Sequence, residues 1–243
     1  MPADLSPPGV SPPGPSYRSY LALERILAAQ RPVTPREDPG IWAAERFFIV
    51  CHQASELWAS QILVDLEEAG RLAGFGDWEA ASAVVLRAAA TAGLLSRTLA
   101  HLGRLPAESF LAFRGALEGA SGAESEQFRG LLRGRRHGPV RRLRAGLRAA
   151  LPAAGEGAPH RPPDCGHAVC ACDAALEAYL GAITAWRGLH AKVAYRFIGD
   201  RPGTGGTEGV GHLLRRIVAD AGEEGDDLGP PPEPELAEHA GDV

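Results

Sequence analysis

The sequence predicts an all-α protein, because it shows helical periodicity throughout and no strand pattern. Apolar residues recur at intervals of three and four in several long stretches, and the stretch at 47–66 contains no Gly or Pro. No stretch of any length alternates apolar and polar residues, and there is no internal repeat. The 243 residues are 45% hydrophobic and 23% charged, which is typical of one globular domain with short appendages.

The helices are expected in the following order. They span residues 17–30 (short and amphipathic, ended by the prolines of 31–40), about 47–66 (long and buried), 77–98 (Ala-rich), 106–119, 124–132, 173–195 and 212–221. Residues 119–122, 151–166 and 199–211 are expected to form breaks or loops. The helical domain therefore covers residues 17–221, between a disordered Pro-rich start (1–16) and a disordered acidic tail (222–243).

Charge and hydropathy exclude several classes of partner. The net charge of −5 does not suggest nucleic acid. Eight arginines between residues 129 and 148 could form a nucleic-acid patch, but no aromatic residues interleave with them, so a solvated helix face is favoured. No run approaches the roughly 18 apolar residues of a membrane helix. No secretory signal is present, so we expect a cytoplasmic protein with reduced cysteines.

The expected helix at 47–66 carries polar residues within an apolar run. His52 and Glu56 are four residues apart and share a face, and Gln53 and Ser55 lie beside them. Each needs a hydrogen-bond partner if it is buried. On this stretch alone, His52 is either a core histidine with a satisfied side chain or part of a functional site.

Three blocks of the chain together point to a known family. The first is the string Phe-Ile-x-x-His-Gln-x-x-Glu-Leu-Trp, which begins at Phe48. The second block begins at Phe113-Arg114, continues with Ala-Ser-Gly at 120–122, and ends with Ser-Glu-Gln-Phe-Arg at 125–129. The third block begins at His190, which is followed by Arg-x-Ile-Gly and then by Gly-Thr-Gly-Gly. In this order the blocks resemble the tryptophan 2,3-dioxygenase family of haem enzymes, over roughly residues 17–218. The resemblance implies a helical bundle domain that encloses a haem.

The resemblance also implies roles for particular residues. His190 would be the axial ligand of a haem b, held noncovalently because Ala194 stands where some relatives carry an attaching cysteine. The distal His52 would accept the indole N–H of L-tryptophan or a derivative, with Phe48 against the ring. Arg114 and Thr204 would bind the carboxylate and ammonium groups of the substrate, and Ser121 and Gly122 would lie near its ring or the haem edge. Tyr17, Tyr20 and Leu21 would reach the substrate from a neighbouring subunit of a homotetramer.

The chain departs from the family pattern in two places. Phe110 stands where the family usually has a tyrosine that touches the substrate carboxylate, so one hydroxyl is lost. The segment between Arg114 and His190 is short, and it contains Cys165, Cys170 and Cys172, which with His167 could bind zinc or be plain thiols.

Three functions remain open on the sequence. The favoured one is a haem-dependent oxygenase that uses O2 to convert L-tryptophan to an N-formylkynurenine-type product. The alternative at the same site is a haem-dependent monooxygenase of a tryptophan derivative or another aromatic amino acid in natural-product biosynthesis. The third is a helical binding or scaffolding protein, with zinc at the cysteine cluster, that has lost haem chemistry.

Overall fold

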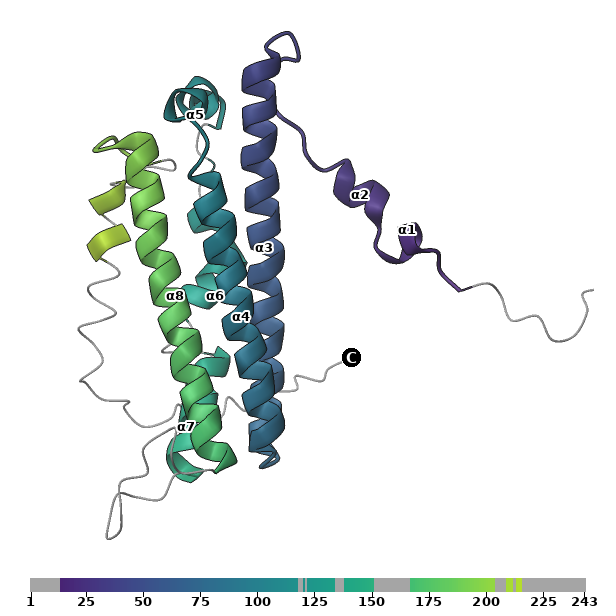
Figure 1. Cartoon of the computed structure of the whole chain (residues 1–243), viewed down its shortest axis with the longest axis vertical. Coiled ribbons are helices and arrows are strands. Elements are labelled where there is room, and N and C mark those ends of the chain that lie inside the picture. Colours follow the sequence, from purple (N-terminus) through teal and green to yellow (C-terminus); the bar gives the residue numbers. More distant parts are fainter. Residues whose placement is uncertain are drawn as a thin grey trace, which may run out of the picture.

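Three long helices form the body of the molecule in the computed structural model, which describes residues 14–117, 120, 122–133, 138–150, 167–203, 209–211 and 213–215. They are α3 (Pro39–Gly74), α4 (Trp78–Leu102) and α8 (Ala168–Ile198), and they run side by side (Figure 1). The shorter elements are α1 (Tyr17–Tyr20), α2 (Leu23–Leu27), α5 (Ala107–Arg114), η1 (Gly115–Leu117), η2 (Gly122–Glu124), α6 (Glu126–Arg133) and α7 (Gly138–Ala150). The described residues contain no strand, so the prediction of an all-α protein is confirmed.

Helix α3 is longer than predicted and only half buried. It begins at Pro39, a residue suited to the first helical turn, and the Asp38 side chain accepts a hydrogen bond from the Ile41 N–H. One face packs into the core through Ala59, Ile62 and Leu66. On the opposite face Leu57 is 62% exposed. The expectation of a wholly buried helix was therefore wrong for that face.

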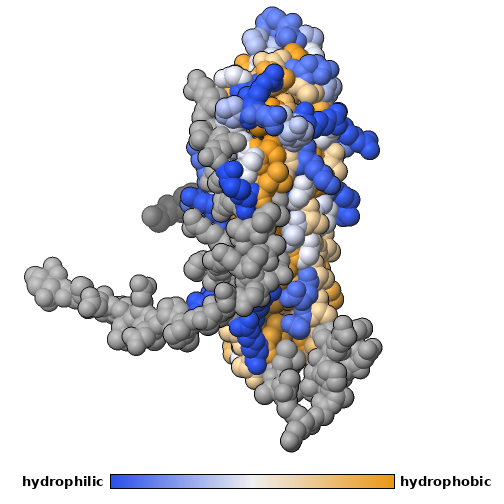
Figure 2. All heavy atoms as spheres, turned by 90° about the vertical axis from the view of Figure 1, so that its left-hand side faces the viewer, coloured by the Kyte–Doolittle hydropathy of each residue, from blue (hydrophilic) through white to orange (hydrophobic). Residues whose placement is uncertain are grey.

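Helices α4 and α8 pack against each other along most of their length. Both are long and apolar enough to cross a membrane by length and composition, although neither is an unbroken run of apolar residues. In the bundle, however, their buried residues belong to one core cluster with those of α3. The predicted stripe on α8 is confirmed, because Leu176, Tyr179 and Ile183 are all buried. On the face shown in Figure 2, apolar surface runs lengthwise between charged side chains.

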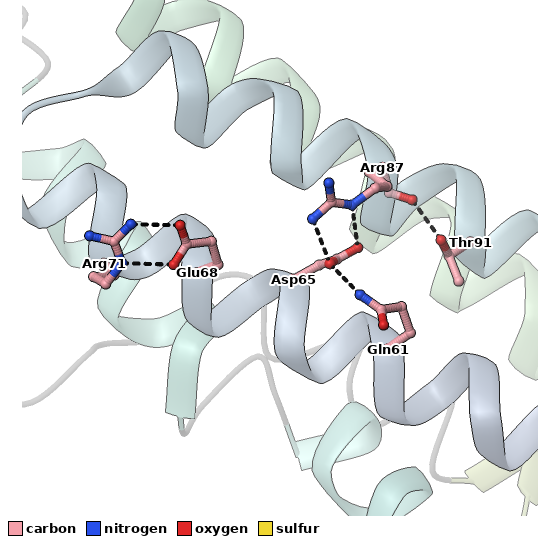
Figure 3. Close-up of polar contacts among 6 residues, drawn as sticks. All are labelled: Gln61, Asp65, Glu68, Arg71, Arg87 and Thr91. Carbon is pink, nitrogen blue, oxygen red and sulfur yellow. Dashed lines mark hydrogen bonds and ion pairs between the residues drawn. The ribbon is translucent and has the colours of Figure 1, made fainter. Parts of the chain in front are cut away.

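A buried carboxylate ties α3 to α4. Asp65 is fully buried, and both of its oxygens accept hydrogen bonds from Arg87, at 2.8 and 3.0 Å (Figure 3). The Gln61 amide donates a third bond at 2.7 Å. The Glu68–Arg71 pair is also bidentate, but both of its side chains are substantially exposed. The two pairs therefore differ in how far each carboxylate depends on its arginine.

The arginines of the 129–148 run whose side chains the structure describes are exposed or half-buried on α6 and α7, in agreement with the predicted solvated helix face. The buried side of α7 is Val140, Leu143 and Leu147. Arg142 pairs with Glu67 of α3, and Arg144 pairs with Glu177 of α8 at 3.2 Å. Arg142 and Arg144 therefore join α7 to α3 and α8 through ion pairs with glutamates.

The N-terminal segment projects away from the bundle (Figure 1). The predicted helix over 17–30 is in fact two short helices, because Ala22 adopts a left-handed conformation with φ of 51°. Glu45, which is buried, anchors the segment to α3. Its carboxylate accepts the N–H groups of Val33 and Thr34, each at 2.8 Å, and the Thr34 hydroxyl.

Replacing Glu45 by alanine is expected to release this segment. Three charge-assisted hydrogen bonds are lost, and each is worth about 1.5–3 kcal/mol. Trypsin should then cleave at Arg31 at least about tenfold faster, because cleavage follows the population of the opened segment. Glu24→Ala, which removes only the exposed partner of Arg18, is the control. An unchanged rate at Arg31 would mean that Glu45 is not the anchor.

Candidate functional site

Four phenylalanines from three helices form an apolar cluster at the α5 end of the bundle. Phe48 of α3 lies with its ring centroid 5.6 Å from Phe110 and 5.5 Å from Phe113, both of α5. Phe110 in turn stacks on Phe197 of α8 at 4.9 Å, with the ring planes 22° apart. The cluster joins α3, α5 and α8, and it supplies the apolar wall that a flat aromatic ligand requires.

His52 lies one helical turn after Phe48 and contacts it. The two ring centroids are 4.0 Å apart, and the His52 Nδ1 lies 2.9 Å from the Phe48 carbonyl oxygen. Because a carbonyl can only accept, Nδ1 carries the proton and donates it. Loss of hydration lowers the pKa of His52, although its bond to Phe48 and the nearby Glu56 act in the opposite direction. A neutral His52 therefore presents Nε2 as an acceptor.

His190 is the second histidine at this site. Burial lowers the pKa of His190 to about 4, and the nearby His52 adds to the shift. The imidazole is therefore neutral around pH 7, which is the form that binds metal. Because the charge of His52 contributes to the pKa shift of His190, α3 and α8 place the two histidines within electrostatic range of each other.

Three parallel rings lead from α6 to His190. Phe128 stacks on Trp186 at 5.1 Å with the planes 1° apart, and Trp186 stacks on His190 at 5.6 Å with the planes 5° apart. Ser125 precedes α6; its hydroxyl donates to Glu56 of α3 at 2.8 Å and accepts the Phe128 N–H at 3.1 Å. Glu56 and Ser125 thus fix the start of α6 beside the site.

The polar residues of the His52 stretch all have partners. The partners of His52 and Glu56 are given above. The Gln53 amide donates to the Ala29 carbonyl at 3.1 Å, and Ser55 donates to the Cys51 carbonyl at 2.8 Å. None of these four side chains is fully buried, so the bonds are present without the burial for which the sequence required them. Cys51 itself is buried, and burial raises the pKa of its thiol, as expected of a small core residue.

Arginines hold the C-terminal end of α8 and the chain beyond it. Arg114, at the end of α5, donates from Nη2 to the carbonyl of Pro202, just before the glycine-rich stretch. Arg196 donates to the carbonyl of Gly103, which follows α4. Arg114 therefore lies at the base of the loop that the sequence assigned to the substrate.

The remaining predicted site residues fall into two groups. Tyr17 and Tyr20 are 74% and 75% exposed and Leu21 also has an exposed side chain; all three lie on the segment that projects from the bundle, around α1 (Figure 1). Gly122 is exposed in η2. Ser121 and Thr204 lie outside the described residues, as do the expected disordered ends before residue 14 and after residue 215.

The cysteine cluster gives no support to a zinc site. Within the part of the chain that the structure describes, no group of three His, Cys, Asp or Glu side chains could hold a metal ion. Cys172 is a free, fully buried thiol whose pKa burial raises to about 11. Cys170 is disulfide-bonded, contrary to the expectation that all cysteines are reduced, and Cys165 lies outside the described residues.

Sequence reasoning missed two features of the site, the Glu56–Ser125 bond and the ring stack. Ser125 could have been recognised as a helix cap, since it directly precedes α6 and an apolar residue follows three positions later. Its pairing with Glu56 joins residues 69 positions apart, so no local signal predicts it.

Together, the fold and the site define an all-α protein in which a cluster of phenylalanines, two neutral histidines and Arg114 come from the helices α3, α5 and α8. A sequence profile described as tryptophan 2,3-dioxygenase matches residues 5–136. The tryptophan 2,3-dioxygenase of Caulobacter vibrioides is 31% identical over 251 residues, covering 83% of this chain and 92% of the relative. That of an Anaeromyxobacter strain is 30% identical, covering 85% and 92%. The enzyme of Kineococcus radiotolerans is 35% identical over 114 residues, covering 47% and 38%.

The chain belongs to the tryptophan 2,3-dioxygenase family. Membership makes it an oxidoreductase of this type and confirms the resemblance drawn from its three sequence blocks. The comparisons do not favour the monooxygenase alternative.

Proposed function

We propose that the chain is a haem-dependent enzyme that converts L-tryptophan and O2 to an N-formylkynurenine-type product. The observation that carries the proposal is the pair of neutral histidines, His52 and His190, brought close together beside an aromatic wall. One is suited to hold a cofactor, and the other presents a free acceptor nitrogen to a substrate.

The residues present fit a haem b. His190 offers a neutral imidazole on a rigid helix, the usual donor for haem iron, and the aromatic residues around it suit a flat macrocycle. Bound haem would supply the iron chemistry that activates O2. Attachment would be noncovalent, since Ala194 provides no thiol.

His52 sets the orientation of the indole. Its Nδ1–H is engaged by the Phe48 carbonyl, so Nε2 is left to accept the indole N–H. Its lowered pKa keeps the acceptor form at neutral pH. Phe48 and Phe110 supply apolar surface against the ring, and Phe110 does so without the hydroxyl that the family usually carries.

Arg114 would bind the substrate carboxylate together with Thr204. A guanidinium has five N–H donors in a planar fork, and the bond to Pro202 engages only one nitrogen. The same bond sets Arg114 at the base of the glycine-rich stretch, which would close over the amino acid end of the substrate. Ser121 and Gly122 would lie near the ring or haem edge.

Replacing Arg114 by lysine is expected to raise KM for L-tryptophan about 10- to 100-fold, because a planar bidentate contact becomes a single-point one. Tryptamine, which has no carboxylate, should be used equally poorly by both proteins, so the preference for tryptophan should collapse. Arg104→Lys, at an exposed arginine, is the control. If the preference for tryptophan over tryptamine survives in Arg114→Lys, the carboxylate role is wrong.

The active form would be a cytoplasmic homotetramer in which Tyr17, Tyr20 and Leu21 complete the site of a neighbouring subunit. The support is their exposure on a segment that leaves its own bundle. Apolar side chains exposed in this way commonly mark an interface.

The deciding experiment is the product mass from haem-loaded, reduced protein given L-tryptophan and O2. Addition of two oxygen atoms is the expected result. Addition of one would move the protein to the monooxygenase alternative. A haem spectrum without turnover would point to a substituted tryptophan as the substrate.

A further inference from the structure

The two histidines of the site are held in different ways. His52 is fixed by the hydrogen bond from its Nδ1 to the Phe48 carbonyl, four residues earlier on α3. His190 makes no hydrogen bond with any described residue, and its four-residue neighbour on α8, Trp186, contacts it through its ring instead. Histidines that bind metals usually donate their second N–H to a protein acceptor, which fixes the ring plane. Among the described residues, His190 has the stacked ring of Trp186 instead of such an acceptor.

We propose that Trp186 is a positioning residue that fixes the plane of the His190 imidazole, and that Phe128 holds Trp186 in place. This inference rests on the proposed role of His190 as haem ligand. The three rings are within 5° of parallel from one to the next, and their centroids lie 5.1 and 5.6 Å apart. A ring held between two others has little freedom to rotate about its side-chain bonds.

The support for Phe128 comes from α3. Glu56 accepts a hydrogen bond from Ser125, and Ser125 accepts the N–H of Phe128. The backbone of Phe128 is therefore tied to α3 through Ser125 and Glu56. The same helix carries His52, which lies four residues before Glu56. The stack ends on His190, so this chain of contacts links the supports of both histidines. The orientation of Trp186, and through it that of His190, thus depends on the junction between α3 and α6.

The test compares Trp186→Phe, which keeps a flat ring, with Trp186→Leu, which keeps apolar volume only. Trp78→Leu is the matched control, because Trp78 packs beside Gly146 of α7, at the opposite end of α4 from the site. All three variants remove a tryptophan from the bundle. Only Trp186→Leu is expected to free the His190 ring.

The first readout uses the apo-protein and does not depend on haem. In protein with 13C-labelled histidine, the His190 ring signal is assigned by its loss in His190→Gln. It is expected at an upfield, ring-current-shifted position in the wild type and the Trp78→Leu protein. Trp186→Phe should keep part of that shift, and Trp186→Leu should lose it.

The second readout is the haem-loaded protein. Trp186→Leu should release haem to an acceptor globin about 10- to 100-fold faster, the usual range when the support of a metal ligand is removed. The electron paramagnetic resonance signal of its ferric form should broaden, while Trp186→Phe and Trp78→Leu stay near wild type. A Trp186→Leu protein with wild-type histidine shift and haem release would overturn the inference and leave the proposed function standing. A wild-type protein with the ring-current shift but no bound haem would instead defeat the proposed function.

Discussion

Replacing His190 by alanine is expected to yield protein that carries less than about a tenth of an equivalent of haem. The His190 imidazole is the donor proposed for iron, and Trp186, which stacks on it, has no atom that could replace it. Haem content and the Soret band after loading are the measurements. Added imidazole should restore part of the band, because it can enter the space that the side chain leaves.

His52→Ala is the matched control for this prediction. It removes the other histidine of the site but not the proposed ligand, so haem content should stay near one equivalent. Circular dichroism should show both variants equally helical. If His190→Ala keeps stoichiometric haem while His52→Ala loses it, the two roles are exchanged.

Replacing Arg87 by methionine is expected to lower Tm by about 10 °C. Asp65 is completely buried and receives two hydrogen bonds from Arg87, so the variant leaves a carboxylate inside the bundle with only Gln61 as a donor. Arg87 itself has 60% of its side chain exposed, yet the part that matters faces inward. Thermal unfolding followed by circular dichroism measures the effect.

Arg71→Met is the comparison, because Arg71 makes an equally bidentate bond to the exposed Glu68 on the same helix. Its Tm should stay within about 2 °C of wild type. The double variant Asp65→Leu with Arg87→Met should recover most of the loss, since neither charge is then left inside. Equal effects of the Arg87 and Arg71 variants would show that Asp65 does not depend on its arginine.

Helices with a continuous apolar stripe were predictable, and those without one were not. The stripe through Leu176, Tyr179 and Trp186 predicted α8, although the helix begins five residues earlier than expected, at Ala168. Residues 17–30 have apolar residues at similar spacing, but no core lies beneath them, and the chain turns at Ala22. Leu57 was expected to be buried for the same reason, and it is exposed.

The site was predictable only where its chemistry follows a linear pattern. His52, Arg114 and His190 stand within recognisable strings, and the structure brings the two histidines together. The contacts that hold them join distant positions, such as Glu56 with Ser125, and depend on how α6 lies against α3 and α8. Packing of that kind is set by the whole bundle and leaves no signal in any one stretch.

The Glu45 anchor gives the N-terminal segment a defined reach. Gln53 of α3 also holds Ala29 and Gln30, so the part that can move starts before Ala29, and the 14 peptide steps from Gly14 to Ala28 span at most roughly 50 Å when fully extended. A partner surface within that radius meets Tyr17 and Tyr20 at the high local concentration of a tethered group. Contacts between the N-terminal segment and the partner would therefore break and re-form without dissociation of the two proteins.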